Sequence, residues 1–207
     1  MPLYDVSLPL RDKMPLFPGD PAFKIEPFFQ RVNGDSFNLA VLSLGTHSGT
    51  HVDPPSHYFD GGATVDQIPL EVLVGPGVVV DMRGRTEIDL SSLKEANLYD
   101  RIRVLFKTDN GPKLRGQFFH EDYVHLTEDA AQYLVAMGVM LVGIDYLSIE
   151  RYGNWGAPVH RALLAANVLV VEAVDLLDVP PGPCEIYCLP LRIEGGDGAP
   201  ARVLIQT

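Results

Sequence analysis

The stretch His47-Ser-Gly-Thr-His51-Val-Asp53-Pro-Pro-Ser-His57 is the part of this 207-residue chain from which the rest is best interpreted. The whole chain has six histidines, so an even spread would place roughly 0.3 of them in a window of this length. The stretch holds three, together with an aspartate. A purification tag or a solvated patch can also be rich in histidine, but neither is interleaved with glycine, threonine, aspartate and a proline pair. The stretch therefore indicates a metal-binding or catalytic cluster.

The spacing within this motif predicts which side chains converge. The proline pair at 54–55 excludes a helix through the motif, and Gly49 weakens one. In an extended segment, residues an even number apart lie on the same side, so we expect His47, His51 and Asp53 to converge. Two imidazoles and one carboxylate suit Zn or Mn. Gly49 is expected to let the backbone approach the metal or the substrate.

His57 has a different expected role. The proline pair turns the chain away from the first three residues of the motif, so His57 need not be a ligand. We expect its side chain to lie over the metal and to carry a proton during catalysis.

The composition is that of an ordinary globular protein with an acidic balance. Sixteen Lys and Arg residues against 27 Asp and Glu residues give a net charge of −11, which argues against nucleic acid and anionic membrane surfaces as partners. No signal peptide and no apolar run of about 18 residues is apparent, so the cytoplasm is the expected location. Cys184 and Cys188 lie four residues apart in a strand-like run. We expect both to be reduced and structural.

A length of 207 residues predicts one domain, or at most two small ones, and we expect a single domain over residues 1–207. Strands and helices mix without strict alternation, which predicts the α/β class with a mixed sheet. Strands are expected at residues 3–8, 36–44, 77–82, 103–107, 139–144, 168–171, 185–193 and 201–205. Helices are expected at residues 91–96, 127–137 and 158–166. Residues 14–21 are expected to form a loop rich in proline and glycine, and residues 111–124 an irregular segment.

Two residues far from the motif in the sequence, Glu172 and His160, are further candidate site residues. Glu172 follows the apolar run 168–171 directly, and a buried carboxylate is costly unless a metal or a cation meets it. A strand end that reaches solvent is the alternative interpretation. His160 lies near the start of the preceding helix, and spacing alone does not decide whether it meets Glu172.

The motif His-x-Gly-Thr-His-x-Asp-x-Pro-x-His resembles the signature of the cyclase / kynurenine formamidase family of metal-dependent hydrolases. The flanking segments 44–46 and 61–76 agree with this resemblance, which extends from residues 14–20 to residues 198–202. It implies the swivelling β/β/α fold of that family. It also implies that His160, which opens a His-x-x-Leu-Leu helix, and Glu172, which closes the next strand, are metal ligands.

The number of metal ions stays open at this point. The five ligands His47, His51, Asp53, His160 and Glu172 are too many for one tetrahedral zinc. They suit two ions about 3.5–4 Å apart, bridged by Asp53 or Glu172. A single six-coordinate ion, held by the motif and water, would suit Mn.

The expected reaction is metal-assisted attack of water on the carbonyl of an amide-type bond, with His57 moving the proton to the leaving nitrogen. The resemblance implies an aryl formamide such as N-formylkynurenine, an intermediate of tryptophan catabolism, as substrate and a homodimer as the assembly. Phe17 and Trp155 are candidates to stack on the substrate ring, with a place in the core as the alternative. Other possibilities are a cyclic-amide hydrolase of the isatin type, a cyclase of secondary metabolism, or a metal-binding domain without turnover.

Overall fold

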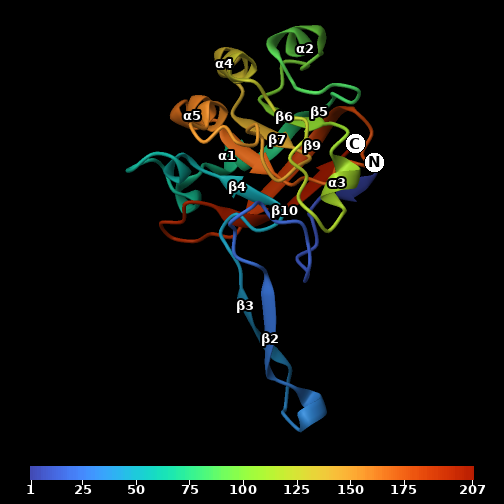
Figure 1. The fold of residues 1–207 in the computed structure, drawn as a ribbon, viewed down its shortest axis with the longest axis vertical. Coiled ribbons are helices and arrows are strands. Elements are labelled where there is room, and N and C mark those ends of the chain that lie inside the picture. Colours follow the sequence, from blue (N-terminus) through green and yellow to red (C-terminus); the bar gives the residue numbers. More distant parts are fainter.

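Seven strands of the computed structural model, which describes residues 1–207, close into a barrel. The sheet order is β1-β10-β4-β8-β7-β6-β5-β9, and β9 also pairs with β10, so the sheet returns to itself with β1 at its margin (Figure 1). The strands are β1 (Leu3–Asp5), β2 (Lys24–Phe29), β3 (Leu39–Ser43), β4 (His51–Asp53), β5 (Val74–Asp81), β6 (Arg103–Lys107), β7 (Leu141–Ile144), β8 (Leu169–Glu172), β9 (Gly182–Pro190) and β10 (Ala199–Gln206). The α-helices are α1 (Leu70–Leu73), α2 (Leu90–Glu95), α3 (Gly111–Leu114), α4 (Glu128–Ala136) and α5 (Pro158–Ala165). Three short 3-10 helices are η1 (Arg31–Asn33), η2 (Pro55–His57) and η3 (Val65–Gln67).

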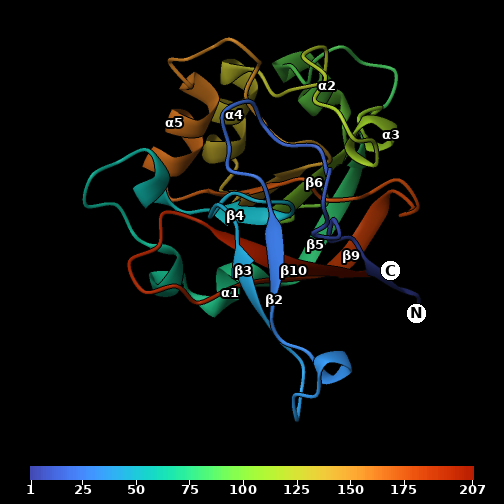
Figure 2. The same cartoon turned by 60° about the horizontal axis from the view of Figure 1, so that its bottom comes forward.

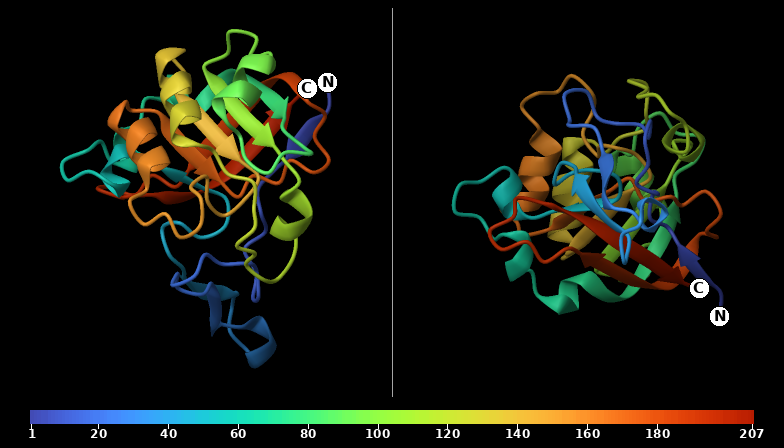
Figure 3. Two further views of the ribbon diagram at one scale, coloured as in Figure 1. Left: turned by 45° about the horizontal axis from the view of Figure 1, so that its top comes forward. Right: turned by 90° about the horizontal axis from the view of Figure 1, so that it is seen from below.

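The sheet is mixed, as the sequence predicts. Strands β5, β6, β7 and β8 run parallel to one another, and the remaining pairings of the sheet are antiparallel. Helices α2, α4 and α5 lie in the crossovers between the parallel strands and together cover one side of the barrel (Figure 3). This arrangement confirms the α/β class.

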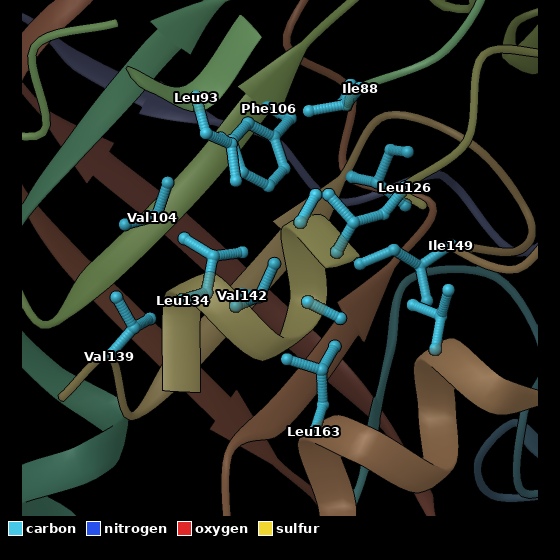
Figure 4. Close-up of a cluster of buried hydrophobic side chains, with 14 of the residues drawn as sticks. Ile88, Leu93, Val104, Phe106, Leu126, Leu134, Val139, Val142, Ile149 and Leu163 are labelled. Atoms are coloured by element: carbon cyan, nitrogen blue, oxygen red, sulfur yellow. The ribbon is translucent and has the colours of Figure 1, made fainter. Parts of the chain in front are cut away.

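The parallel strands are buried on both faces, which explains why they appear in the sequence as continuous apolar runs. Val78 and Val80 of β5 point to a cluster under the helices, while Val79 between them points into the barrel. Strand β6 alternates in the same way, with Val104 on the helical side and Leu105 inside the barrel. Figure 4 shows the helical side of this core, where side chains from the strands and from α4 and α5 interdigitate.

Most predicted elements are present, with boundaries that differ by a few residues. Two expectations need correction. The segment 111–124 is not wholly irregular, because it begins with the helical turn α3. Strand β2 was not expected, since Pro27 interrupts its apolar pattern and proline is excluded from central strands; it is tolerated here because β2 pairs only with β3.

Strands β2 and β3 form an arm that projects away from the barrel (Figure 2). Every residue of both strands is exposed. The arm nevertheless carries large apolar side chains, including Ile25, Phe28 and Leu42, which are 60%, 63% and 55% exposed. Exposed apolar side chains gathered on one element are typical of a surface that packs against another molecule. Such packing would also stabilise the arm, since an isolated two-stranded hairpin is only marginally stable in water.

Cys184 and Cys188 are free and buried on β9, in the core of the barrel. Burial raises the pKa of Cys188 to about 12, which keeps its thiol protonated and unreactive. This confirms the structural role expected for both residues. None of the helices has the length and apolar character that a membrane-spanning segment requires.

Candidate metal centre and active site

The register of two strands brings the motif to the distant glutamate. His51 lies directly opposite Glu172 in the antiparallel ladder between β4 and β8. Directly opposed residues project from the same face of a sheet, and His51 Nε2 lies 3.6 Å from Glu172 Oε2. Asp53 lies two residues further along the same face, with Oδ1 3.3 Å from His51 Nε2. The alternation expected for the motif therefore holds for His51 and Asp53.

His47 reaches the site by another route. It lies in a turn and not in a strand, so the expectation that the whole motif is extended was wrong for its first half. Gly49 bends the chain with a φ of 65°, in the left-handed region that favours glycine. His47 Nδ1 then lies 2.8 Å from Asp53 Oδ1. The turn after Pro190 packs against the other side of the ring, where a Cβ on Gly198 would lie 2.5 Å from His47 Cε1.

His160 approaches from the helical side of the barrel. It lies in the first turn of α5, and the short connection to β8 returns the chain so that the start of the helix faces the end of the strand. His160 Nε2 is 3.1 Å from Glu172 Oε1 and 3.7 Å from Asp53 Oδ2. The stacked ring of Tyr58, with its centroid at 5.1 Å, covers one face of the imidazole.

Glu172 does not reach solvent, which was the alternative interpretation of a charged residue at this strand end. Its side chain is buried, and Oε1 accepts a hydrogen bond of 2.7 Å from the backbone N–H of Ile149. The structure thus brings together all five residues expected as ligands, around Asp53.

The donor set fits a divalent metal. Two groups of ligand atoms, each within 4.8 Å of one another, are His47/Asp53/His57 and His51/Asp53/Glu172. Imidazole nitrogens and carboxylate oxygens without a thiolate are the donors that Zn and Mn accept. No lysine or arginine lines the cavity that opens over these ligands, so none neutralises the buried carboxylates. Asp53 belongs to both groups, so the geometry suits either one ion or two that share this carboxylate.

The pKa values of the site residues in the metal-free protein also indicate a site for a cation. Burial opposes protonation of His47, but the hydrogen bond and charge of Asp53 outweigh it and raise the pKa to about 9. Burial likewise opposes protonation of His160, while contacts with Glu150 and Glu172 raise its pKa to about 10. Burial alone would raise the pKa of Asp53, but the surrounding histidines hold it well below its usual range. Without a metal, protons on the histidines balance the carboxylates.

His57 differs from the other histidines. It closes η2, directly after the proline pair, and its ring centroid lies 4.0 Å from that of His47. Burial lowers its pKa below the ordinary value, only partly offset by the charge of Asp53. A neutral imidazole beside the cluster has a free lone pair and can accept a proton at neutral pH.

A cavity of about 230 Å³ opens over the cluster. Its lining includes Phe17 and Tyr58, along with the site histidines and Glu172. Trp155 is 74% exposed, so it is not a core residue; it lines a smaller cavity that shares Phe17 and Tyr58 with the first. The cavity therefore has an aromatic wall and a polar floor.

The chain matches the family model described as a putative cyclase over residues 4–151. It is 35% identical to a kynurenine formamidase of Salinibacter ruber, over 100% of this chain and 98% of that protein. It is 38% identical to cyclase-like protein 2 of Oryza sativa subsp. japonica, over 84% of this chain and 66% of that protein. The chain belongs to the cyclase / kynurenine formamidase family of metal-dependent hydrolases.

Solved structures of similar proteins share the fold over nearly the whole chain. A potential metal-dependent hydrolase with cyclase activity superposes with a TM-score of 0.86 at 35% identity, covering 99% of this chain and 96% of that one. Isatin hydrolase A of Ralstonia solanacearum gives a TM-score of 0.82 at 26% identity, covering 99% and 91%. The fold expected from the resemblance is thereby confirmed.

Three residues at the site were not predicted from the sequence. Asp197 Oδ2 lies 3.3 Å from His47 Nε2. Asp20 lines the cavity, and partial burial raises the pKa of its carboxyl group. Glu150 lies behind His160, with Oε2 3.6 Å from His160 Nδ1. Asp20 and Asp197 lie in loops rich in glycine and proline, where sequence gives no register to place a side chain.

Proposed function

We propose that this cyclase-family chain is a metal-dependent amidohydrolase, and that its substrate is an aryl formamide such as N-formylkynurenine, cleaved to formate and an aromatic amine. The observation that carries the proposal is the convergence of His51, Asp53 and Glu172, beside a cavity that His51 and Glu172 line together with His57. The kynurenine formamidases among its relatives support the choice of a formyl group.

Lewis acidity toward water and toward the substrate carbonyl is what a divalent metal, Zn or Mn, would supply at this site. The residues that would hold it are His47, His51 and Asp53, with His160 and Glu172 completing a second position. Asp53 orients two of these ligands at once, since Oδ1 lies 2.8 Å from His47 Nδ1 and 3.3 Å from His51 Nε2.

His57 moves the proton in this mechanism. Its lowered pKa leaves the imidazole neutral at pH 7, so it accepts the proton that the attacking water loses. It then donates this proton to the leaving nitrogen, because an anilide anion is too basic to depart unprotonated. Proton transfer of this kind contributes roughly 10²–10⁴ to a rate.

The cavity favours a small aromatic substrate. Its volume of about 230 Å³ lies below the roughly 300–1,000 Å³ of pockets for drug-sized ligands. Phe17 and Tyr58 offer faces or edges to an aryl ring, and Trp155 lines the adjoining smaller cavity, which a longer substituent would enter.

A cyclic amide of the isatin type is the second candidate, supported by the structural likeness to isatin hydrolase A. A panel of N-formylkynurenine, formanilide, isatin and an aryl ester, assayed with the Zn-loaded and Mn-loaded enzyme, separates the candidates. We expect rapid turnover of the two formamides and little of isatin. The reverse ranking would assign the chain to the cyclic-amide branch, and no turnover at all would leave a secondary-metabolism cyclase or a non-catalytic domain.

We also propose that the protein is a homodimer and that the β2–β3 arm forms the contact. Nothing in the chain covers either face of the arm, and the apolar groove on it is lined by Ile25, Phe29 and Leu39, among others. Stable complexes bury about 800 Å² per partner, and a second copy that received the arm and gave its own in return would cover both of its exposed strands. The arm begins after Asp20 and ends before His47, so docking would also fix the two loops that border the site.

A further inference from the structure

Glu150 is a buried carboxylate that no lysine or arginine neutralises. Its side chain lies in the loop after β7, and only 6% of the residue is exposed. Oε2 accepts hydrogen bonds from the backbone N–H groups of Val159 at 2.9 Å and His160 at 3.4 Å, and Oε1 accepts one from Asn154 Nδ2 at 3.2 Å. The two bonds from the backbone of Val159 and His160 cap α5, whose preceding residue Ala157 has no side-chain acceptor to do so.

Capping alone does not account for this choice of residue. A short polar side chain next to the helix caps equally well, without the cost of burying a long carboxylate. The position of Glu150 has a second consequence, since its carboxylate lies behind the imidazole of His160, on the side away from Glu172 and Asp53.

The two nitrogens of His160 therefore face different acceptors. Nε2 lies 3.1 Å from Glu172 Oε1, on the side of the metal centre. Nδ1 is buried, has no hydrogen-bond partner, and lies 3.6 Å from Glu150 Oε2. That distance is about half an ångström longer than a hydrogen bond, and no other polar partner is available to this nitrogen.

We propose that Glu150 is the positioning residue of His160: its carboxylate takes the Nδ1 proton as a hydrogen bond, and so directs the Nε2 lone pair to the metal centre. The proposal rests on the metal centre described above and not on the identity of the substrate. A ligating histidine holds its metal most firmly when its other nitrogen donates to a carboxylate or a carbonyl.

His51 is positioned in the same way, with a backbone carbonyl in place of a carboxylate as the acceptor. Its Nδ1 lies 2.8 Å from the carbonyl oxygen of Gly49, which leaves Nε2 toward Asp53 and Glu172. The Nδ1 atoms of His51 and His160 thus each face an acceptor, a backbone carbonyl for His51 and a carboxylate for His160. Because a carboxylate makes the ring a stronger donor to a metal, Glu150 is expected to matter most for the ion held by His160 and Glu172.

The test compares Glu150→Gln with Asn154→Ala. Glutamine keeps an oxygen for the Val159 and His160 N–H groups but loses the charge that takes the Nδ1 proton. Asn154→Ala removes a hydrogen bond to the same carboxylate and leaves its contact with His160. Metal-free protein is titrated with Zn²⁺ against a chromophoric chelator, and circular dichroism and thermal denaturation report the fold.

We expect Glu150→Gln to weaken binding of one Zn²⁺ by about 10–100-fold, with circular dichroism unchanged, and Asn154→Ala to bind as the wild type does. Nitrogen-15 spectra of the Zn-loaded wild type should show the His160 proton on Nδ1. Unchanged Zn²⁺ affinity in Glu150→Gln, or a proton on Nε2, would reduce Glu150 to a helix cap and overturn the proposal. No step uses a substrate, so the proposal can stand if the formamidase assignment fails.

Discussion

His51 and Glu172 lie directly opposite each other across the β4–β8 ladder, although 120 residues separate them in the sequence. This pairing fixes the distance from His51 Nε2 to Glu172 Oε2 at 3.6 Å. The short motif and the distant glutamate are therefore parts of one site, held by backbone hydrogen bonds and not by the flexibility of a loop.

Asp53→Ala should abolish metal binding and activity together. Asp53 is the carboxylate shared by both groups of ligand atoms, so its loss removes a ligand from each. We expect metal affinity to fall by more than the roughly 100-fold seen when only an outer contact is lost. Elemental analysis of purified protein and an assay of formate release measure the two effects. Asp60→Ala is the control, since Asp60 is an exposed carboxylate outside both groups of ligand atoms, and a retained metal content in Asp53→Ala would contradict the assignment.

His57→Ala should keep the metal and lose roughly 10²–10⁴ in kcat. The reason is that His57 carries the proton, while His47, His51 and Asp53 hold the metal. The structure makes this test necessary, because ring nitrogens of His57 and His47 and an oxygen of Asp53 lie within 4.8 Å of one another. Loss of bound metal in the variant would show that His57 is a ligand.

Metal affinity should rise with pH between 6 and 8. The pKa values of about 9 for His47 and about 10 for His160 mean that both rings carry protons at neutral pH in the metal-free protein, and a metal must displace them. The same raised pKa values stabilise the metal-free fold fully below about pH 6.5, and this contribution is lost as the pH rises through 9 to 10. Zn²⁺ titrations at pH 6, 7 and 8 should show increasing affinity with proton release on binding. An affinity independent of pH would mean that the rings are already neutral.

Polar substitutions on the arm should convert a dimer into a folded monomer. Ile25 and Leu42 are cross-strand partners, and neither is packed against the core of the barrel, so Ile25→Lys with Leu42→Glu removes apolar surface from the arm and leaves an opposite-charge pair across its two strands. Light scattering should give a mass near twice the 22.7 kDa of the chain for the wild type and a single-chain mass for the variant. Leu70→Glu, at an exposed apolar position outside the arm, should leave the mass unchanged. A wild type that scatters as a single chain at micromolar concentration would rule out the dimer.

The sequence predicted the parallel strands of the barrel well because both of their faces are buried. Each of them contains a short run that is apolar throughout, such as residues 78–80 and 104–106, so hydrophobicity alone identifies these strands. The arm was predicted only in part. Strand β3 has a recognisable apolar pattern, but Pro27 obscures β2, and no local signal tells that this pair leaves the barrel.

The candidate site was predicted to the extent that its residues lie in one motif or match a family pattern. The run 168–171 drew attention to Glu172 but left a solvent-exposed strand end as the alternative. The assignment of His160 and Glu172 as ligands came from the resemblance, because their meeting depends on the connection between α5 and β8, which spacing does not specify. Asp197 and Glu150 were missed for a similar physical reason. Each reaches a histidine from a loop, Asp197 across 150 residues of sequence and Glu150 across 10, and a loop has no periodicity from which the direction of a side chain can be predicted.

The most direct test of a catalytic metal at this site is to remove the metal and return it. Protein dialysed against a chelator should hold less than one ion per chain by elemental analysis, keep its circular dichroism spectrum, and no longer release formate from N-formylkynurenine. Addition of Zn²⁺ or Mn²⁺ should restore the rate, with at least one ion bound per chain. Full activity in the metal-free protein would contradict the account, and unfolding on chelation would indicate a metal that only stabilises the fold.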